Sequence, residues 1–202
     1  MRSVNFVDQG ANRYVVGQVK PYDQKNEMFK RPWWDSAMIE LGEKFYHTPI
    51  RPRDKPGYRL RDLSLVNAAW RLEREFAQGV RGGRMGLYDW EWDGHFGFPR
   101  VPPGLKISPD ESRDITRAVK KAATFFGASL LGICELDRRW IYSSAYFITP
   151  EGGKVAENTV PDEFRYAIVI AVEMDYEAIR RSPAAPASAA TGLGYSKMAY
   201  VA

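Results

Sequence analysis

The chain has very little cysteine or histidine and no long apolar run. One cysteine, Cys134, and two histidines, His47 and His95, occur among 202 residues. A lone cysteine excludes a disulfide framework, and the two histidines lie in neither an HxxxH nor a CxxC frame, so we predict no metal site in this chain. No stretch of roughly 18 apolar residues is present, so the sequence predicts no membrane-spanning helix. The N-terminus also lacks the apolar core of an export signal.

Aromatic and apolar residues are plentiful. Hydrophobic residues make up 45% of the sequence and aromatic residues 13%. A chain of this length and composition can bury a core, which excludes a disordered segment. Seventeen glycines and thirteen prolines indicate many turns.

The charge is mildly basic, with 29 Lys and Arg against 25 Asp and Glu. A basic balance permits nucleic-acid binding as one function class, and such binding would depend steeply on salt. The basic residues are scattered among acidic ones, and no RNP-like aromatic motif is present. We therefore predict no nucleic-acid partner.

The chain divides into two parts by pattern. Residues 1–60 are rich in aromatics and interrupted by prolines, which predicts an irregular N-terminal wrap with one short helix near Ser36–Phe45. Residues 61–202 are predicted to form the body. A helix is expected over Asp62–Gln78, capped by Asp62 and ended by Gly79, followed by a long loop over 79–104.

The rest of the body alternates helix and strand. Ser108–Glu111 has the residues of a capping box, apolar residues then recur at helical spacing to Phe126, and Gly127 supplies a stop. Apolar runs at Ala128–Leu136 and Phe164–Met174 predict strands, the second in a sheet covered on both faces. This order predicts an α/β fold. A further helical pattern runs to Ala202 without a cap, so we expect a truncated chain.

One polar pair lies near the end of the chain. Thr191 and Tyr195 are four residues apart and share a face if the segment is helical. Gly192 and Gly194 each lower helix stability by about 1 kcal/mol, which favours close approach of a bulky group. A phenol beside such a gap can deliver a proton, but the spacing alone favours a core tyrosine packed on small residues. Cys134, within an apolar strand, is expected to be a buried small side chain.

Several blocks resemble the corrinoid-dependent iron–sulfur reductive dehalogenases. These are Arg31-Pro32-Trp33, Ala68-Ala69-Trp70 with Phe76, the stretch Thr116–Ser144 with FFGASLLGICELDRRWIYS, and Tyr176–Ala202 with SAATGLGYSKMAYVA. The resemblance covers most of the chain after about residue 28, and the order and spacing of the blocks agree.

The resemblance implies reductive removal of halide from a small organohalide by a cob(I)alamin-type corrinoid fed by two [4Fe–4S] clusters. It identifies Tyr195 with the family's proton donor and Thr191 with a residue lining the substrate cavity. It also identifies Trp33, Trp70 and Phe76 with aromatic walls of that cavity. A chlorinated hydrocarbon offers little to hydrogen-bond, so an apolar aromatic box suits it. The implied fold is a partial nitroreductase-like, corrinoid-binding body.

The family's cluster ligands are cysteines, which one Cys cannot replace. The resemblance therefore implies the N-terminal part of a dehalogenase, inactive alone. It also implies a membrane-anchor or electron-donor partner and export by the twin-arginine route to the outer face of the cytoplasmic membrane. No twin-arginine leader is present in the sequence. Two alternatives remain open: a related epoxyqueuosine reductase, disfavoured by the aromatic wrap, and a non-catalytic corrinoid-binding or interaction protein.

Overall fold

The computed structural model describes residues 15–77, 112–149 and 152–202, which belong to two compact units. The first unit combines the described residues before position 50 with Glu135–Arg165, and the second combines those of Ile50–Cys134 with Tyr166–Ala202. Helices and strands are both present, in agreement with the predicted α/β class. The wrap over 1–60 and the body over 61–202 stay predictions. The predicted loop at 79–104 and capping box at Ser108–Glu111 lie outside the described residues.

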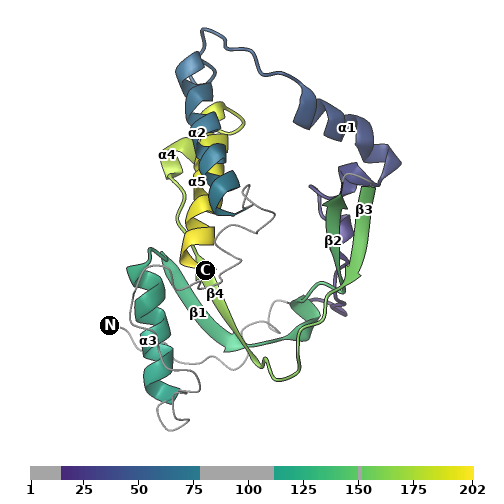
Figure 1. The fold of residues 1–202 in the computed structure, drawn as a ribbon, viewed down its shortest axis with the longest axis vertical. Helices are drawn as coiled ribbons and strands as arrows, with labels where there is room; N and C mark the ends of the chain where they lie inside the picture. The colour runs from purple at the N-terminus through teal and green to yellow at the C-terminus, as the bar shows by residue number, and fades with distance from the viewer. Residues whose placement is uncertain (1–14, 78–111, 150–151) are drawn as a thin grey trace, which may run out of the picture. The chain divides into compact units, whose positions relative to one another are not determined.

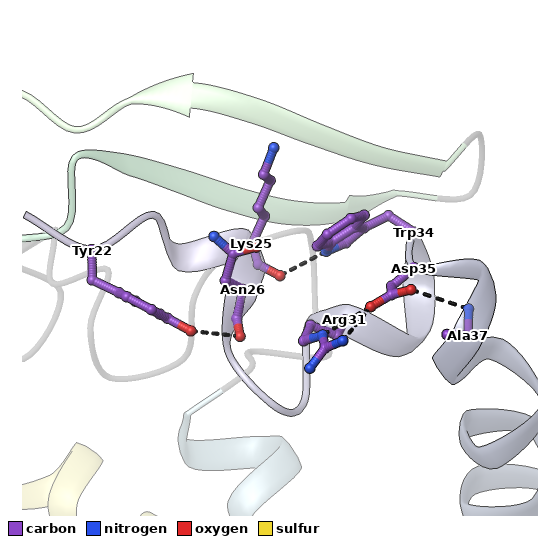
Figure 2. A network of polar contacts seen from close by, with 7 residues as sticks. All are labelled: Tyr22, Lys25, Asn26, Arg31, Trp34, Asp35 and Ala37. Atoms are coloured by element: carbon purple, nitrogen blue, oxygen red, sulfur yellow. Dashed lines mark hydrogen bonds and ion pairs between the residues drawn. The ribbon is translucent and has the colours of Figure 1, made fainter.

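The first unit opens with two 3-10 turns, η2 (Gln24–Asn26) and η3 (Arg31–Trp33), and the helix α1 (Ser36–His47). Asp35 starts α1, because its carboxylate accepts the backbone N–H of Ala37 at 3.1 Å and pairs with Arg31 (Figure 2). The Arg31 guanidinium, followed by the Ala37 N–H, lowers the pKa of Asp35. This confirms the short helix predicted near Ser36–Phe45. The same figure shows the Trp34 indole donating to the carbonyl of Lys25 at 2.6 Å.

A hairpin from much later in the sequence completes this unit. Strands β2 (Ser144–Thr149) and β3 (Gly152–Glu157) pair antiparallel, with Ser144 opposite Glu157. Ser144 donates its hydroxyl to Asp23 at 2.8 Å, and the Tyr146 N–H donates to the Gln24 side chain at 2.8 Å. These bonds join η2 to β2 across about 120 residues of chain.

The 3-10 turn η6 (Arg138–Trp140) precedes the hairpin and lies within the DRRWIYS block. Asp137 caps it by accepting the backbone N–H of Arg139 at 3.0 Å, and the Arg139 guanidinium contributes most to lowering the pKa of Asp137 to about 2. Arg138 donates to the carbonyls of Val160 and Pro161, both at 2.9 Å. Arg138 therefore holds backbone, while the Arg139 guanidinium pairs with the Asp137 carboxylate.

Tyr146 buries a hydroxyl that has no hydrogen-bond partner among the described residues, and its side chain is only 4% exposed. A buried, unpaired polar group costs about 1–3 kcal/mol. We expect Tyr146→Phe to raise the free energy of unfolding by about 1 kcal/mol, since it keeps the ring and removes the unpaired group. Chemical denaturation of the two proteins measures this. A lower stability of the Phe variant would show that the hydroxyl contributes favourably.

The second unit contains α2 (Leu60–Phe76), α3 (Ser112–Phe125), β1 (Leu130–Glu135), β4 (Tyr166–Ala171), α4 (Tyr176–Ile179) and α5 (Ala185–Val201). Gly127 follows α3 with φ of 108°, a left-handed conformation that glycine adopts without a steric penalty. The predicted stop after Phe126 is therefore confirmed.

Helix α2 begins earlier than predicted. The N-cap is Arg59, and Asp62 lies at the third helical position, where its carboxylate accepts the Arg59 backbone N–H at 3.0 Å. The expected capping by Asp62 is thus wrong in position, although its carboxylate does bond the start of the helix. The helix ends at Phe76, and Gly79 lies outside the described residues.

Strands β1 and β4 form a two-stranded ladder. The Ser129 N–H donates to Ala171 and the Leu136 N–H to Arg165, so the two strands run in opposite directions. The expected sheet covered on both faces is wrong for the described residues, because β4 exposes most of its apolar side chains. Cys134 is likewise exposed, since it alternates with the more buried Leu131 and Ile133.

The packing of α2 on α5 supplies most of the buried core of this unit. Figure 1 shows the two helices side by side, with α4 against α5. The core residues on α5 are almost all small: Ala185, Ala187, Ala189, Ala190, Gly192, Gly194, Ser196 and Ala199. Ala69 and Glu73, one turn apart, are the buried residues of α2. In the ranges described, no helix has the length and apolar character needed to cross a bilayer.

Candidate functional site

The indole of Trp70 lies directly on the backbone of α5. A Cβ built on Gly192 would meet three atoms of the Trp70 ring at 3.1–3.2 Å, closer than ordinary van der Waals contact. The sequence favours approach of a bulky group to the glycines of this helix, and the structure confirms it at Gly192. The Trp70 ring can therefore occupy this position because residue 192 has no side chain.

Tyr195 of α5 lies beside Trp70 of α2. The ring centroids of Trp70 and Tyr195 are 6.1 Å apart and their planes are tilted by 44°. The two side chains remain accessible, with 36% of Trp70 and 53% of Tyr195 exposed. The Tyr195 hydroxyl has no hydrogen-bond partner among the described residues. An exposed phenol next to an aromatic surface can donate a proton to a molecule held on that surface.

Thr191 lies one turn before Tyr195, as predicted, because the segment is helical. Its hydroxyl donates to the carbonyl of Ala187 at 2.9 Å, so the side chain is tied to its own helix. The structure therefore brings together Trp70, Thr191 and Tyr195 of the predicted site. The hydroxyl hydrogen of Thr191 is already used in its bond to Ala187.

Phe76 is not part of this cluster, and Trp33 is not in the same unit as the cluster. Phe76 is the last residue of α2, six positions after Trp70, and at about 100° per residue it lies on a different face of the helix. Trp33 belongs to the first unit, where its ring packs against Tyr46 at 5.7 Å. Their assignment to the walls of a substrate cavity stays a prediction.

Gly194 faces the opposite side of α5. A Cβ there would lie 2.9 Å from Met174 Cγ, so the segment after β4 packs as closely on the helix as Trp70 does. A cleft of about 540 Å³ opens on this side, and Met174, Lys197, Tyr200, Phe126, Glu173 and Asp175 are among its lining residues. Tyr195 is not among them. Lys197 thus points away from Tyr195, as its spacing of two residues predicts.

Ser188 holds Trp70 at its other edge and is absent from the predicted site. The Trp70 Nε1–H donates to the Ser188 hydroxyl at 3.0 Å. Ser188 lies one turn before Gly192, so a polar residue preceding the glycine on the same helical face is the pattern that could have identified it.

The donor set for metals is sparse. In the portions that the structure describes, no three His, Cys, Asp or Glu side chains gather closely enough to hold a metal ion. Cys134 supplies a single exposed thiol, and a [4Fe–4S] cluster takes four thiolates, so the clusters do not fit these residues. Trp70 and Tyr195 offer exposed aromatic surface for apolar contact with a bound group.

Comparison with known proteins shows a consistent likeness. No protein-family profile matches the chain. The tetrachloroethene reductive dehalogenase of Dehalobacter restrictus is 32% identical over 150 residues, covering 58% of this chain and 27% of the relative. That of Desulfitobacterium hafniense is 31% identical over the same extent. That of Sulfurospirillum multivorans is 28% identical over 200 residues, covering 83% of this chain and 39% of the relative.

The chain thus spans between about a quarter and two fifths of the length of these relatives. All three carry the same name, and the alignment with the third covers most of this sequence. The resemblance found in the sequence blocks is confirmed. Over the region that matches, the chain is similar to tetrachloroethene reductive dehalogenases.

Proposed function

We propose that this chain is the substrate-facing part of a corrinoid-dependent reductive dehalogenase, with Tyr195 as the proton donor. The observation that carries the proposal is the contact of the Tyr195 and Trp70 rings, 6.1 Å apart, on exposed surface of the second unit. The names of the relatives support a small organohalide, such as a chlorinated ethene, as the substrate class.

The surface suits that substrate class. A chlorinated ethene has no hydrogen-bond donor, so shape and apolar contact must hold it, and the face of Trp70 provides such contact. In the net reaction the carbon–halogen bond breaks, the halide leaves with the electron pair, and two electrons and one proton enter. The Tyr195 hydroxyl supplies that proton to the carbon, forming the new C–H bond.

A corrinoid, when bound, would supply the electrons for this reaction. Trp70 and Tyr195 are the residues that would face it, while [4Fe–4S] ligands cannot come from this sequence with its single cysteine. A nitroreductase-like body, a membrane-anchor or electron-donor partner, and export to the outer face of the cytoplasmic membrane belong to the same proposal. They rest on the family.

Halide release tests the proposal. A corrinoid-loaded protein that contains this sequence, given a strong reductant and tetrachloroethene, is expected to release chloride. The 202-residue chain alone, with free corrinoid and the same reductant, is expected to release no more chloride than the corrinoid itself, because it lacks cluster ligands. Turnover by the isolated chain would contradict this expectation. Tight corrinoid binding without chloride release from any protein containing the chain would favour a binding-only function.

A further inference from the structure

We infer that Ser188 is a positioning residue, which fixes the Trp70 indole on α5 and thereby sets how well the site binds its substrate. The inference rests on the proposed function, because it assigns Trp70 the role of a contact surface. Ser188 is the first residue of the block SAATGLGYSKMAYVA, but the resemblance assigns it no role.

Three consecutive turns of α5 contact Trp70. Ser188 accepts the indole N–H at 3.0 Å, Gly192 underlies the ring at 3.1–3.2 Å from the position of a Cβ, and Tyr195 lies 6.1 Å away between centroids. Gly192 allows the close approach of the indole but does not fix the orientation of the ring, since a flat ring can rotate on a flat backbone surface. The hydrogen bond to Ser188 fixes that orientation.

Because Trp70 is partly exposed, its orientation depends on the bond to Ser188. Trp70 is 36% exposed, so burial alone does not hold the ring in one orientation. An indole N–H can donate only one hydrogen bond, and losing the Ser188 acceptor leaves water as the replacement. The ring then samples other orientations on Gly192. Its distance to the Tyr195 phenol varies with them.

The first test observes Trp70 directly. In chain labelled with ¹⁵N-tryptophan, the six indole N–H groups give separate resonances, and Trp70→Phe identifies the one from Trp70. In Ser188→Ala we expect exchange of this indole proton with solvent to rise about five- to tenfold, the factor for loss of one hydrogen bond. Ser188→Thr, which keeps the hydroxyl, should keep the exchange rate of the wild-type chain. Ser64→Ala is the matched control, since the Ser64 hydroxyl bonds its own helix at Leu60.

The second test measures turnover in the corrinoid-loaded protein that contains this sequence. We expect Ser188→Ala to raise KM several-fold with kcat changed less than twofold, because binding surface is disordered while the Tyr195 proton donor remains. Ser188→Thr should return KM to its original value. Gly192→Ala, whose methyl displaces the ring, should raise KM as well and should not be rescued by Ser188→Thr.

The outcomes are distinguishable. An unchanged exchange rate of the Trp70 indole proton in Ser188→Ala overturns the inference, whatever the enzyme does. Faster exchange with an unchanged KM, in an enzyme that Tyr195→Phe inactivates, also overturns it and leaves the proposed function standing. Faster exchange in a protein that never dehalogenates shows that Ser188 holds Trp70 in place and rejects the proposed function instead.

Discussion

Replacing Tyr195 by phenylalanine is expected to lower dechlorination by about 10²- to 10⁴-fold, the range for loss of a general acid. The change removes one hydroxyl that has no partner among the described residues and keeps the ring that packs beside Trp70. The fold and the aromatic surface should therefore persist. Chloride release by the corrinoid-loaded protein that contains this sequence measures the loss, together with the corrinoid content of the purified variant.

Tyr200 offers a matched control on the same helix. It is 54% exposed, nearly the same as Tyr195, and its ring packs against Phe126 at 6.0 Å, away from Trp70. Tyr200→Phe is expected to leave the rate within about twofold, since a surface change away from the reacting atoms alters little. An unchanged rate in Tyr195→Phe, or equal losses in both variants, would remove Tyr195 from the role of proton donor.

The second large effect is expected in the hairpin of the first unit. A Cβ on Gly153 would overlap the Tyr146 hydroxyl oxygen and Cζ, so Gly153→Ala forces the buried ring out of its place. Exposing such a ring costs about 2–3 kcal/mol. We expect the thermal midpoint of this unit to fall by more than about 5 °C, as followed by circular dichroism. Amide exchange in β2 and β3 should increase with it.

Gly132 supplies the comparison for that change. It is also a strand glycine, in β1, and a Cβ there would meet nothing within 4 Å. Gly132→Ala is expected to change the free energy of unfolding by less than about 0.5 kcal/mol. Equal midpoints for the two variants would mean that Tyr146 does not rest on Gly153.

Local patterns predicted the helices of this protein well. The recurrence of apolar residues, the prolines and Gly127 identified α1, α2, α3 and α5 within a few residues, since helix formation depends on neighbours in sequence. The glycines of α5 even predicted close contacts on that helix. The partners, Trp70 and Met174, lie outside the segment and could not be derived from its spacing.

Burial of the strands was harder to predict because it depends on distant chain. Cys134 lies in an apolar run, which is typical of a covered strand, yet the ladder of β1 and β4 leaves it exposed. The joining of Asp23 to Ser144 has no local signature either. Of the site, the spacing of Thr191 and Tyr195 was sufficient to place both on one face. The position of Ser188 one turn before Gly192 can also be read from the sequence, but its bond to Trp70 cannot.

The hydroxyls along α5 have a consequence for selectivity. Thr191 donates to Ala187, Ser196 donates to Gly192, and Ser188 accepts from Trp70, so three of the polar groups on this helix serve the protein's own structure. A ligand on the Trp70 surface would meet the Tyr195 hydroxyl as its hydrogen-bonding group on α5. Molecules that compete for such a surface are discriminated by their size and shape. In an apolar pocket a single methylene changes the preference between two substrates by about 10- to 200-fold. Halogen number and ring size, rather than polar substituents, would then decide what reacts.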